Sequence, residues 1–312
     1  MAMHPHDNGG WENRNWHPGE NGGAAEENGG STEFVSCDLC GADDAALVET
    51  EGRFRMPVRN VVCRRCGLVY INPRMTVEGY THFYAHDYGR LYSLPESPTP
   101  RSVKGQVKRG QAIASFLEPL LGRGQRMLDV GCAAGGILYV FRRRWGCEGL
   151  GIEPSGPYAE YGRRHFGLEI IPHNPGDPSF PDREFDSIIL SRVLERFLSP
   201  SEGLLLMRRH LAPGGYLYIE VPNLRKPYGA ITHFFQNAHP YTFSPLTLGL
   251  LLERTGYAIV RYDDSGTFMR VAARVLPGRF PRGVDPRRGD DWRAVLKGVE
   301  DHRRHRKARR AA

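Results

Sequence analysis

The chain has 312 residues, of which 42 are Lys or Arg and 35 are Asp or Glu, so its formal net charge is +7. This length allows one core of about 200 residues and one smaller module. No apolar stretch reaches the ~18 residues of a membrane-spanning helix, and the first residues do not read as a signal peptide. We therefore expect no membrane segment and a cytoplasmic location, where thiols stay reduced.

The positive charge is concentrated at the end of the sequence. Residues 279–312 carry 12 Arg or Lys and 5 Asp or Glu, which accounts for the whole net charge of +7. A basic tail is weaker support for nucleic-acid binding than a basic groove in the core. We therefore expect a small-molecule partner and no nucleic acid, and assign 278–312 to a basic C-terminal tail, in which a proline-interrupted segment is followed by a basic helix or tail.

Residues 1–33 are rich in Gly, Asn and Glu and contain almost no aliphatic side chains. Such a segment cannot bury enough apolar surface to offset the entropy of ordering. We predict a disordered tail over 1–33.

Two Cys-x-x-Cys-Gly sequences follow the tail, with 22 residues between them. They supply Cys37, Cys40, Cys63 and Cys66. Each turn directs two thiolates towards one point, and four thiolates form a tetrahedral structural zinc site. The alternative is two redox dithiols or cysteines without a metal, which a reducing compartment disfavours. We predict a zinc-ribbon-like module over 34–75.

An aromatic cluster lies next, at irregular spacing, with Tyr80, Phe83, Tyr84, Tyr88 and Tyr92. It is either a cap over the mouth of the following domain or part of the core between two domains. Three prolines between 95 and 100 indicate a linker, so 76–104 is assigned to an aromatic cap and linker. Apolar residues at helical spacing predict a helix from 107 to 121.

Residues 128–136 read Leu-Asp-Val-Gly-Cys-Ala-Ala-Gly-Gly, a short strand followed by a turn of small residues. Such a turn lets the backbone approach a bound nucleoside. Glu153 stands 22 residues after Gly131, where an acid accepts hydrogen bonds from ribose hydroxyls. A dinucleotide fold would require glycine at Ala133, and Asp129 would repel a pyrophosphate. A carboxylate there suits an amino-bearing ligand, which indicates S-adenosylmethionine.

Strands and helices alternate along the rest of this region. Strands are predicted over 126–130, 148–152, 168–171, 185–190, 216–221, 257–262 and 267–275, and helices over 135–145, 156–166, 200–211 and 244–255. This is a βαβ series that ends in an antiparallel hairpin.

The turn at 128–136 resembles motif I of the class I S-adenosylmethionine-dependent methyltransferases. Val-Leu-Glu-Arg at 193–196 is similar to the fourth-strand motif of this family, with Arg196 in place of the usual His. Ala-Pro-Gly-Gly at 212–215 looks like the entry to the fifth strand. The resemblance covers 105–277 and implies an α/β fold with a Rossmann-like seven-stranded sheet.

The resemblance also implies which residues bind the donor, around the carboxyl ends of the first, second and fourth strands. These are Asp129, Gly131, Cys132, Ala133, Gly135, Glu153, Pro154, Ser191 and Leu194, with Asp177 for the adenine amino group. The alternatives for the last position are Asn174, or a merely turn-forming Asp177.

Residues 233–245 follow the fifth strand and resemble the corresponding region in methyltransferases of polysaccharide and natural-product gene clusters, many of which carry paired Cys-x-x-Cys knuckles. His239 is the candidate base, since an imidazole with a pKa near neutrality can remove a hydroxyl proton. Tyr241 and Gln236 are candidates for orienting the acceptor. The alternative is that His239 only holds the loop. Sugar carbon methyltransferases have His-Glu-His here, and the Glu is absent from this chain.

The predicted function is methyl transfer from S-adenosylmethionine to a hydroxyl of a sugar, nucleotide sugar or natural-product intermediate. The cofactors implied are S-adenosylmethionine and structural Zn²⁺. RNA methylation, carbon methylation of a sugar and a non-catalytic binding role are the alternatives. The sequence makes no prediction of oligomeric state.

Overall fold

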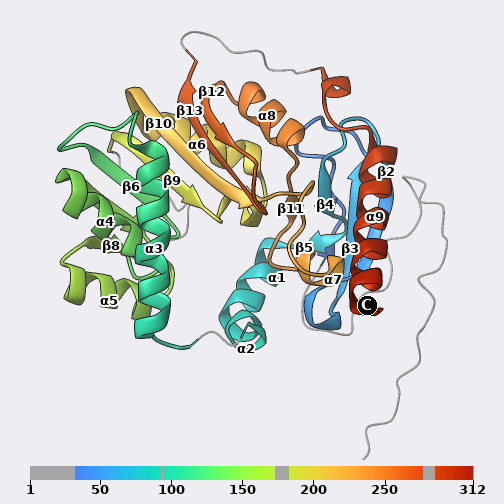
Figure 1. Cartoon of the computed structure of the whole chain (residues 1–312), viewed down its shortest axis with the longest axis horizontal. Helices are drawn as coiled ribbons and strands as arrows, with labels where there is room; N and C mark the ends of the chain where they lie inside the picture. The colour runs from blue at the N-terminus through green and yellow to red at the C-terminus, as the bar shows by residue number, and fades with distance from the viewer. Residues whose placement is uncertain (1–31, 93–94, 173–182, 277–284, 312) are drawn as a thin grey trace, which may run out of the picture.

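The computed structural model of the chain describes residues 32–92, 95–172, 183–276 and 285–311 (Figure 1). Most of the predicted disordered tail lies outside the described residues, as do Asn174 and Asp177. Thr32–Glu33, at the end of that tail, form strand β1, which pairs with β5 (Arg74–Met75).

A seven-stranded sheet forms the centre of the larger domain, in the order β12-β13-β10-β9-β6-β7-β8. The strands are β6 (Arg126–Val130), β7 (Glu148–Ile152), β8 (Glu169–Ile171), β9 (Phe185–Ser191), β10 (Leu211–Pro222), β12 (Tyr257–Asp263) and β13 (Phe268–Val275). Strands β6 to β10 run parallel, and β13 is antiparallel to β10 and β12. The predicted α/β sheet with a terminal hairpin is confirmed.

Alternate residues of each strand face opposite layers of helices. Met127 packs with α3, α4 and α5, whereas its neighbour Leu128 packs with α6 and α8. The bounds are α3 (Pro100–Leu117), α4 (Gly136–Trp145), α5 (Gly156–Phe166), α6 (Pro200–His210) and α8 (Pro245–Arg254). Helix α3 begins seven residues before the predicted start, because the Thr99 side chain caps it by accepting from Ser102 N at 3.1 Å.

The N-terminal module is a four-stranded sheet in the order β11-β4-β3-β2. Its strands are β2 (Ala45–Glu51), β3 (Pro57–Cys63), β4 (Val69–Ile71) and β11 (Tyr241–Thr242), with the short helix η1 (Arg53–Arg55) between β2 and β3. Strand β11 comes from the segment after β10, so the larger domain contributes one edge strand to the module.

Helix α9 (Trp292–Ala311), after the short helix η4 (Pro286–Arg288), packs against β2 and β3 (Figure 1). Val299 is buried with Val62 and Val69, and Arg303 forms an ion pair with Glu49 at 2.6 Å. The segment predicted as a tail therefore folds, where it is described, as the outer layer of the module. No described helix is long and apolar enough to cross a membrane.

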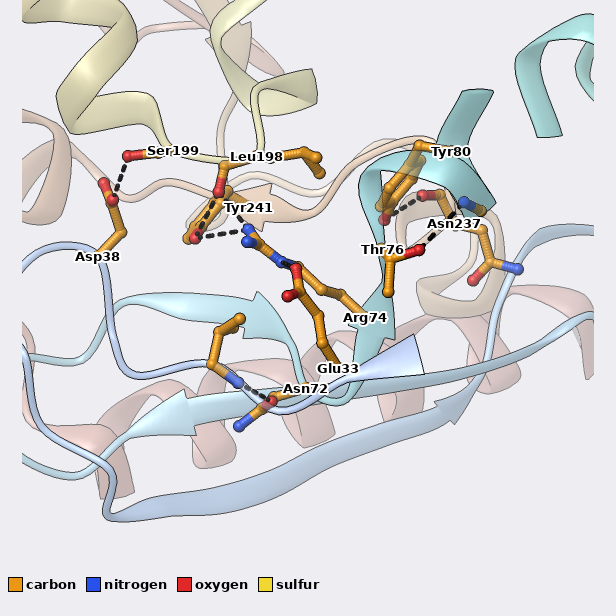
Figure 2. Close-up of polar contacts among 12 residues, drawn as sticks. Glu33, Asp38, Asn72, Arg74, Thr76, Tyr80, Leu198, Ser199, Asn237 and Tyr241 are labelled. Carbon is orange, nitrogen blue, oxygen red and sulfur yellow. Dashed lines mark hydrogen bonds and ion pairs between the residues drawn. The ribbon is translucent and has the colours of Figure 1, made fainter. Parts of the chain in front are cut away.

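Polar contacts join the module to the larger domain (Figure 2). Asp38, inside the first cysteine turn, accepts hydrogen bonds from Ser199 Oγ at 2.8 Å and from Ser201 N at 2.9 Å. Arg74 pairs with Glu33 at 2.9 Å and donates to the carbonyl of Leu198. The segment between β9 and α6 is thus fixed by the module as well as by its own sheet.

Helices α1 (Val77–His82), η2 (Phe83–Asp87) and α2 (Tyr88–Leu91) lie between the two parts. Tyr80 and Phe83 are buried, whereas Tyr84 is 38% exposed. Tyr80 Oη donates to the carbonyl of Asn237 at 3.1 Å (Figure 2), and Tyr84 Oη to that of Ala238 at 3.3 Å. The aromatic segment therefore packs between the two parts of the chain, and its hydroxyls hold the residues before His239.

Candidate active site

In the small-residue turn after β6, several residues have positive φ, a conformation that glycine adopts more easily than other residues. Gly131 and Gly135 lie at φ +69° and +77°, and Ala133 at φ +50°. A Cβ on Gly131 would lie 2.8 Å from Val193 Cγ2, and one on Gly135 would lie 2.4 Å from Leu168 Cδ1. Ala133 occupies the left-handed region despite its Cβ, which costs about 1–2 kcal/mol. The turn is therefore held tightly, and the alanine is a strained substitute for glycine.

Asp129 is buried near the carboxyl end of β6, with 1% of its surface exposed. Within the described part of the chain, neither carboxylate oxygen has a hydrogen-bond partner. Burial raises its pKa to about 8, while the positive charge of Arg109 opposes the shift. A buried carboxylate without a partner costs free energy unless a ligand supplies a donor. These two unpaired acceptor oxygens therefore fit an ammonium-bearing ligand such as S-adenosylmethionine.

Glu153 follows β7 and is held by the turn itself. Its Oε2 accepts from Ala133 N and its Oε1 from Ser155 N, both at 2.9 Å. Each oxygen keeps a second lone pair for a ribose hydroxyl. The structure thus brings Glu153 to the glycine turn, and adds an unpredicted role in fixing the backbone of Ala133.

Helix α3 contributes two polar side chains that the sequence reasoning missed. Gln106 Oε1 accepts from Ala134 N at 3.1 Å. Arg109 is half-buried, and the charges of Asp129 and Glu220 act on it. Their position in an amphipathic helix gave no signal, because polar residues on such a helix usually face solvent.

The other residues predicted to bind S-adenosylmethionine lie around the same edge of the sheet. Ser191 ends β9, and its Oγ donates to Glu220 Oε1 of β10 at 3.4 Å. Leu194 is fully buried in the short helix η3 (Leu194–Arg196), Cys132 is buried, and Pro154 is exposed. Arg192, between them, pairs with Glu220 at 3.1 Å.

Glu195 and His239 meet in the space after β9 and β10. Both are buried, and Glu195 Oε1 lies 3.8 Å from His239 Nε2. Neither oxygen of Glu195 has a hydrogen-bond partner among the described residues. Burial raises the pKa of Glu195 to about 7, although the charge of Arg196 opposes this. The sequence analysis placed this carboxylate in the fourth-strand motif but gave it no part in proton transfer.

The expectation of a near-neutral pKa for His239 is wrong. Burial lowers the pKa of this imidazole well below its ordinary value. Three guanidinium groups lower it further, those of Arg196, Arg53 and Arg192. His239 is therefore neutral at pH 7, and Glu195 is the stronger proton acceptor of the two.

Gln236 and Tyr241 lie on either side of His239 in the sequence but have different surroundings. Gln236 Nε2 lies 3.1 Å from His239 Nδ1 and also donates to Tyr228 Oη at 3.1 Å. Tyr241 is in β11, and its hydroxyl donates to the carbonyl of Leu198 at 3.2 Å, beside Arg74 (Figure 2). These contacts give Tyr241 a position in the joint between module and domain.

The four predicted metal ligands converge. The sulfurs of Cys37, Cys40, Cys63 and Cys66 all lie within 4.8 Å of one another. The distances from Cys37 to Cys66 and from Cys40 to Cys63 are both 3.5 Å. Sulfurs around a tetrahedral zinc ion lie about 3.8 Å apart for Zn–S bonds of ~2.3 Å. The cluster therefore fits a metal of this kind.

Comparison with known proteins gives the same assignment for the larger domain. A family model described as a methyltransferase domain matches residues 105–262, which is half of the chain. The chain belongs to this family. The larger domain is thus that of an S-adenosylmethionine-dependent methyltransferase.

The curated relatives act on different substrates. The thiol S-methyltransferase of Homo sapiens is 24% identical over 166 residues, 50% of this chain and 67% of the relative. The tRNA U34 carboxymethyltransferase of Pseudoalteromonas translucida is 27% identical over 164 residues, and the match spans only half of that enzyme. A solved methyltransferase from Aquifex aeolicus is 20% identical, with a TM-score of 0.46 over 58% of this chain and 100% of the other.

Proposed function

We propose that this methyltransferase transfers a methyl group to a hydroxyl oxygen of a small molecule, namely a sugar, nucleotide sugar or natural-product intermediate. The observation that carries the proposal is the pairing of Glu195 with His239, since a hydroxyl acceptor must lose a proton during transfer. When bound, S-adenosylmethionine supplies an electrophilic methyl carbon. Asp129 would hold its ammonium group and Glu153 its ribose hydroxyls.

The residues of this chain would take up the proton that the acceptor hydroxyl loses on methylation, and this proton would pass to the Glu195–His239 pair. Neither oxygen of Glu195 has a hydrogen-bond partner among the described residues, so the carboxylate can accept this proton, with the neutral His239 ring beside it at 3.8 Å. Most of the rate enhancement would come from alignment, with a smaller part from this base. Gln236 would orient the ring, and the four cysteines would hold a structural Zn²⁺ outside the reaction centre.

The proposal is tested by incubating the full chain with labelled donor and a panel of sugars, nucleotide sugars, thiols and tRNA. We expect label in a hydroxyl compound. His239→Ala should lower turnover by about 100-fold without weakening donor binding. His233→Ala is the matched control, since this histidine is exposed in the same segment.

The pH dependence gives a second readout. The ionised Glu195 supports proton removal, so kcat/KM should rise as pH increases through about 7. Glu195→Gln should remove this rise. If the wild-type rate did not depend on pH, or if His239→Ala were fully active, the pair would take no part in proton removal. Catalysis would then come from alignment of the substrates only.

RNA methylation is a second candidate, because one relative is named as a tRNA enzyme and α9 is basic. Several described cations of α9 are already paired with acids, including Arg303 with Glu49 and Lys297 with Asp301. Label in tRNA but in no small molecule would favour this candidate.

A further inference from the structure

Five side chains from three separate segments form a continuous wall, here called the arginine–aromatic wall. Its members are Arg53, Phe54, Tyr88, Tyr92 and Arg196. The Arg196 Cζ lies 5.4 Å from the Tyr88 ring centre, and the Tyr88 and Tyr92 rings are 4.5 Å apart. Arg53 Cζ lies 5.0 Å from both the Tyr92 and the Phe54 rings. The wall thus runs from the segment after β9, across the aromatic cap, to the loop between β2 and β3.

The loop that carries Arg53 is strained. Phe54 and Arg55 both have positive φ, at +63° and +59°, where side chains are disfavoured. Arg53 N donates to the carbonyl of Phe235 at 2.9 Å, which fixes the loop against the segment before His239. Strain of this kind costs about 1–3 kcal/mol per residue and persists where the surroundings enforce it. Here the result is a guanidinium held beside the candidate active site.

Within the described part of the chain, the two guanidinium groups of the wall have no acidic hydrogen-bond partner. Arg53 forms no ion pair with any described residue, and the hydrogen bonds of Arg196 go to the carbonyl of Arg192 and the Tyr84 hydroxyl. Both side chains are only partly exposed. Their charges, with that of Arg192, lower the pKa of His239, so all three act on one space. Of the three, Arg192 pairs with Glu220 and Arg196 lies next to Glu195, which leaves Arg53 as the guanidinium without an acid beside it among the described residues.

We propose that the arginine–aromatic wall binds a phosphate group of the acceptor, with Arg53 as the principal contact, so that the substrate is a phosphorylated small molecule such as a nucleoside-diphosphate conjugate. This inference rests on the proposed function, because it places the acceptor hydroxyl near Glu195 and His239. A guanidinium matches phosphate oxygens through paired N–H donors. Aromatic neighbours hold the guanidinium in position and shield one part of it from water.

A matched control lies in the same loop. Arg55 is exposed and lines a hollow of about 270 Å³, together with Glu51, Phe54 and His233. Arg53→Gln and Arg55→Gln remove the same charge from neighbouring positions. They therefore separate binding through Arg53 from binding through Arg55 in this hollow.

The experiment is calorimetric titration of the full chain, saturated with S-adenosylhomocysteine, using uridine diphosphate, inorganic pyrophosphate, uridine and a short single-stranded RNA. We expect uridine diphosphate and pyrophosphate to bind and uridine not to bind. Arg53→Gln should weaken binding of the two phosphates at least 10-fold, Arg53→Lys less, and Arg55→Gln under 2-fold.

Several outcomes would overturn the inference. They are equal binding of uridine and uridine diphosphate, equal effects of the two Gln variants, and RNA binding that depends on Arg53 while the small phosphates do not bind. Donor binding is measured separately in each variant. If the wild-type chain did not bind S-adenosylhomocysteine, the proposed function would be wrong. If it bound S-adenosylhomocysteine but neither phosphate compound, only the proposal of phosphate binding by the arginine–aromatic wall would be wrong.

Discussion

Asp129→Asn should stabilise the ligand-free protein and weaken donor binding at the same time. The folded-state pKa of Asp129 is about 8, whereas an unfolded Asp titrates near 3.9. At pH 7 the folded carboxyl is protonated and the unfolded one is ionised, which costs about 4 kcal/mol of stability. Asn never ionises, but its amide would be buried without partners, at a cost of about 1–3 kcal/mol. The net gain expected at pH 7 is therefore about 1–3 kcal/mol.

The sign of the pH dependence follows from the raised pKa. An acid whose folded pKa exceeds its unfolded value makes the protein less stable as pH rises from about 4 to about 8. The advantage of Asp129→Asn should thus grow between pH 5 and pH 8 in urea unfolding without ligand. Glu148→Gln, an exposed carboxylate on β7, is the control and should change stability by under ~0.5 kcal/mol. A variant that is less stable at every pH, or a difference that does not vary with pH, would refute the burial argument.

Three further predictions concern the turn, the metal and the joint. Ala133→Gly should raise the free energy of unfolding by about 0.5–1 kcal/mol because glycine takes the positive φ without strain. Ala134→Gly, at a position without positive φ, should lower it. If both variants were less stable than the wild type, Ala133 would not be strained. Purified protein should contain about one zinc per chain by elemental analysis, and Cys63→Ser should lose it and melt at a lower temperature. Asp38→Asn should lower the free energy of unfolding by about 1–3 kcal/mol, since it weakens the bonds to α6, while the exposed Asp43→Asn should have no effect.

The features that could be predicted from sequence are those set by neighbouring residues. The turn after β6 needs positive φ at Gly131 and Gly135, and small residues are a local signal of that need. The two Cys-x-x-Cys-Gly turns are equally local, since Gly41 and Gly67 both take positive φ directly after their cysteines. Strand and helix periodicity likewise predicted the βαβ series and its terminal hairpin, and the family resemblance implied that the sheet has seven strands.

The features that could not be predicted depend on residues far apart in the chain. Arg303 and Glu49 are 254 residues apart, and no local pattern indicates that α9 would cover β2 and β3. The contact of Glu195 with His239 joins the segments after two different strands. The pKa of His239 depends on burial and on Arg53, which belongs to the other module. The composition of α9 is dominated by basic residues. The few apolar side chains that pack it against the module, such as Val299, are too widely spaced to predict a buried helix face.

The position of α9 has a consequence for biosynthesis. Val62 and Val69 leave the ribosome early, but Val299, which covers them, follows about 230 residues later, or roughly 10–50 s at ordinary rates of synthesis. Asp290 N also donates to the carbonyl of Cys66, next to the cysteine cluster. During that interval the cysteine turns can capture a metal, while the apolar face of β3 and β4 stays open to water or to a chaperone. The apolar face of the module is therefore covered only after the whole methyltransferase sheet has been made.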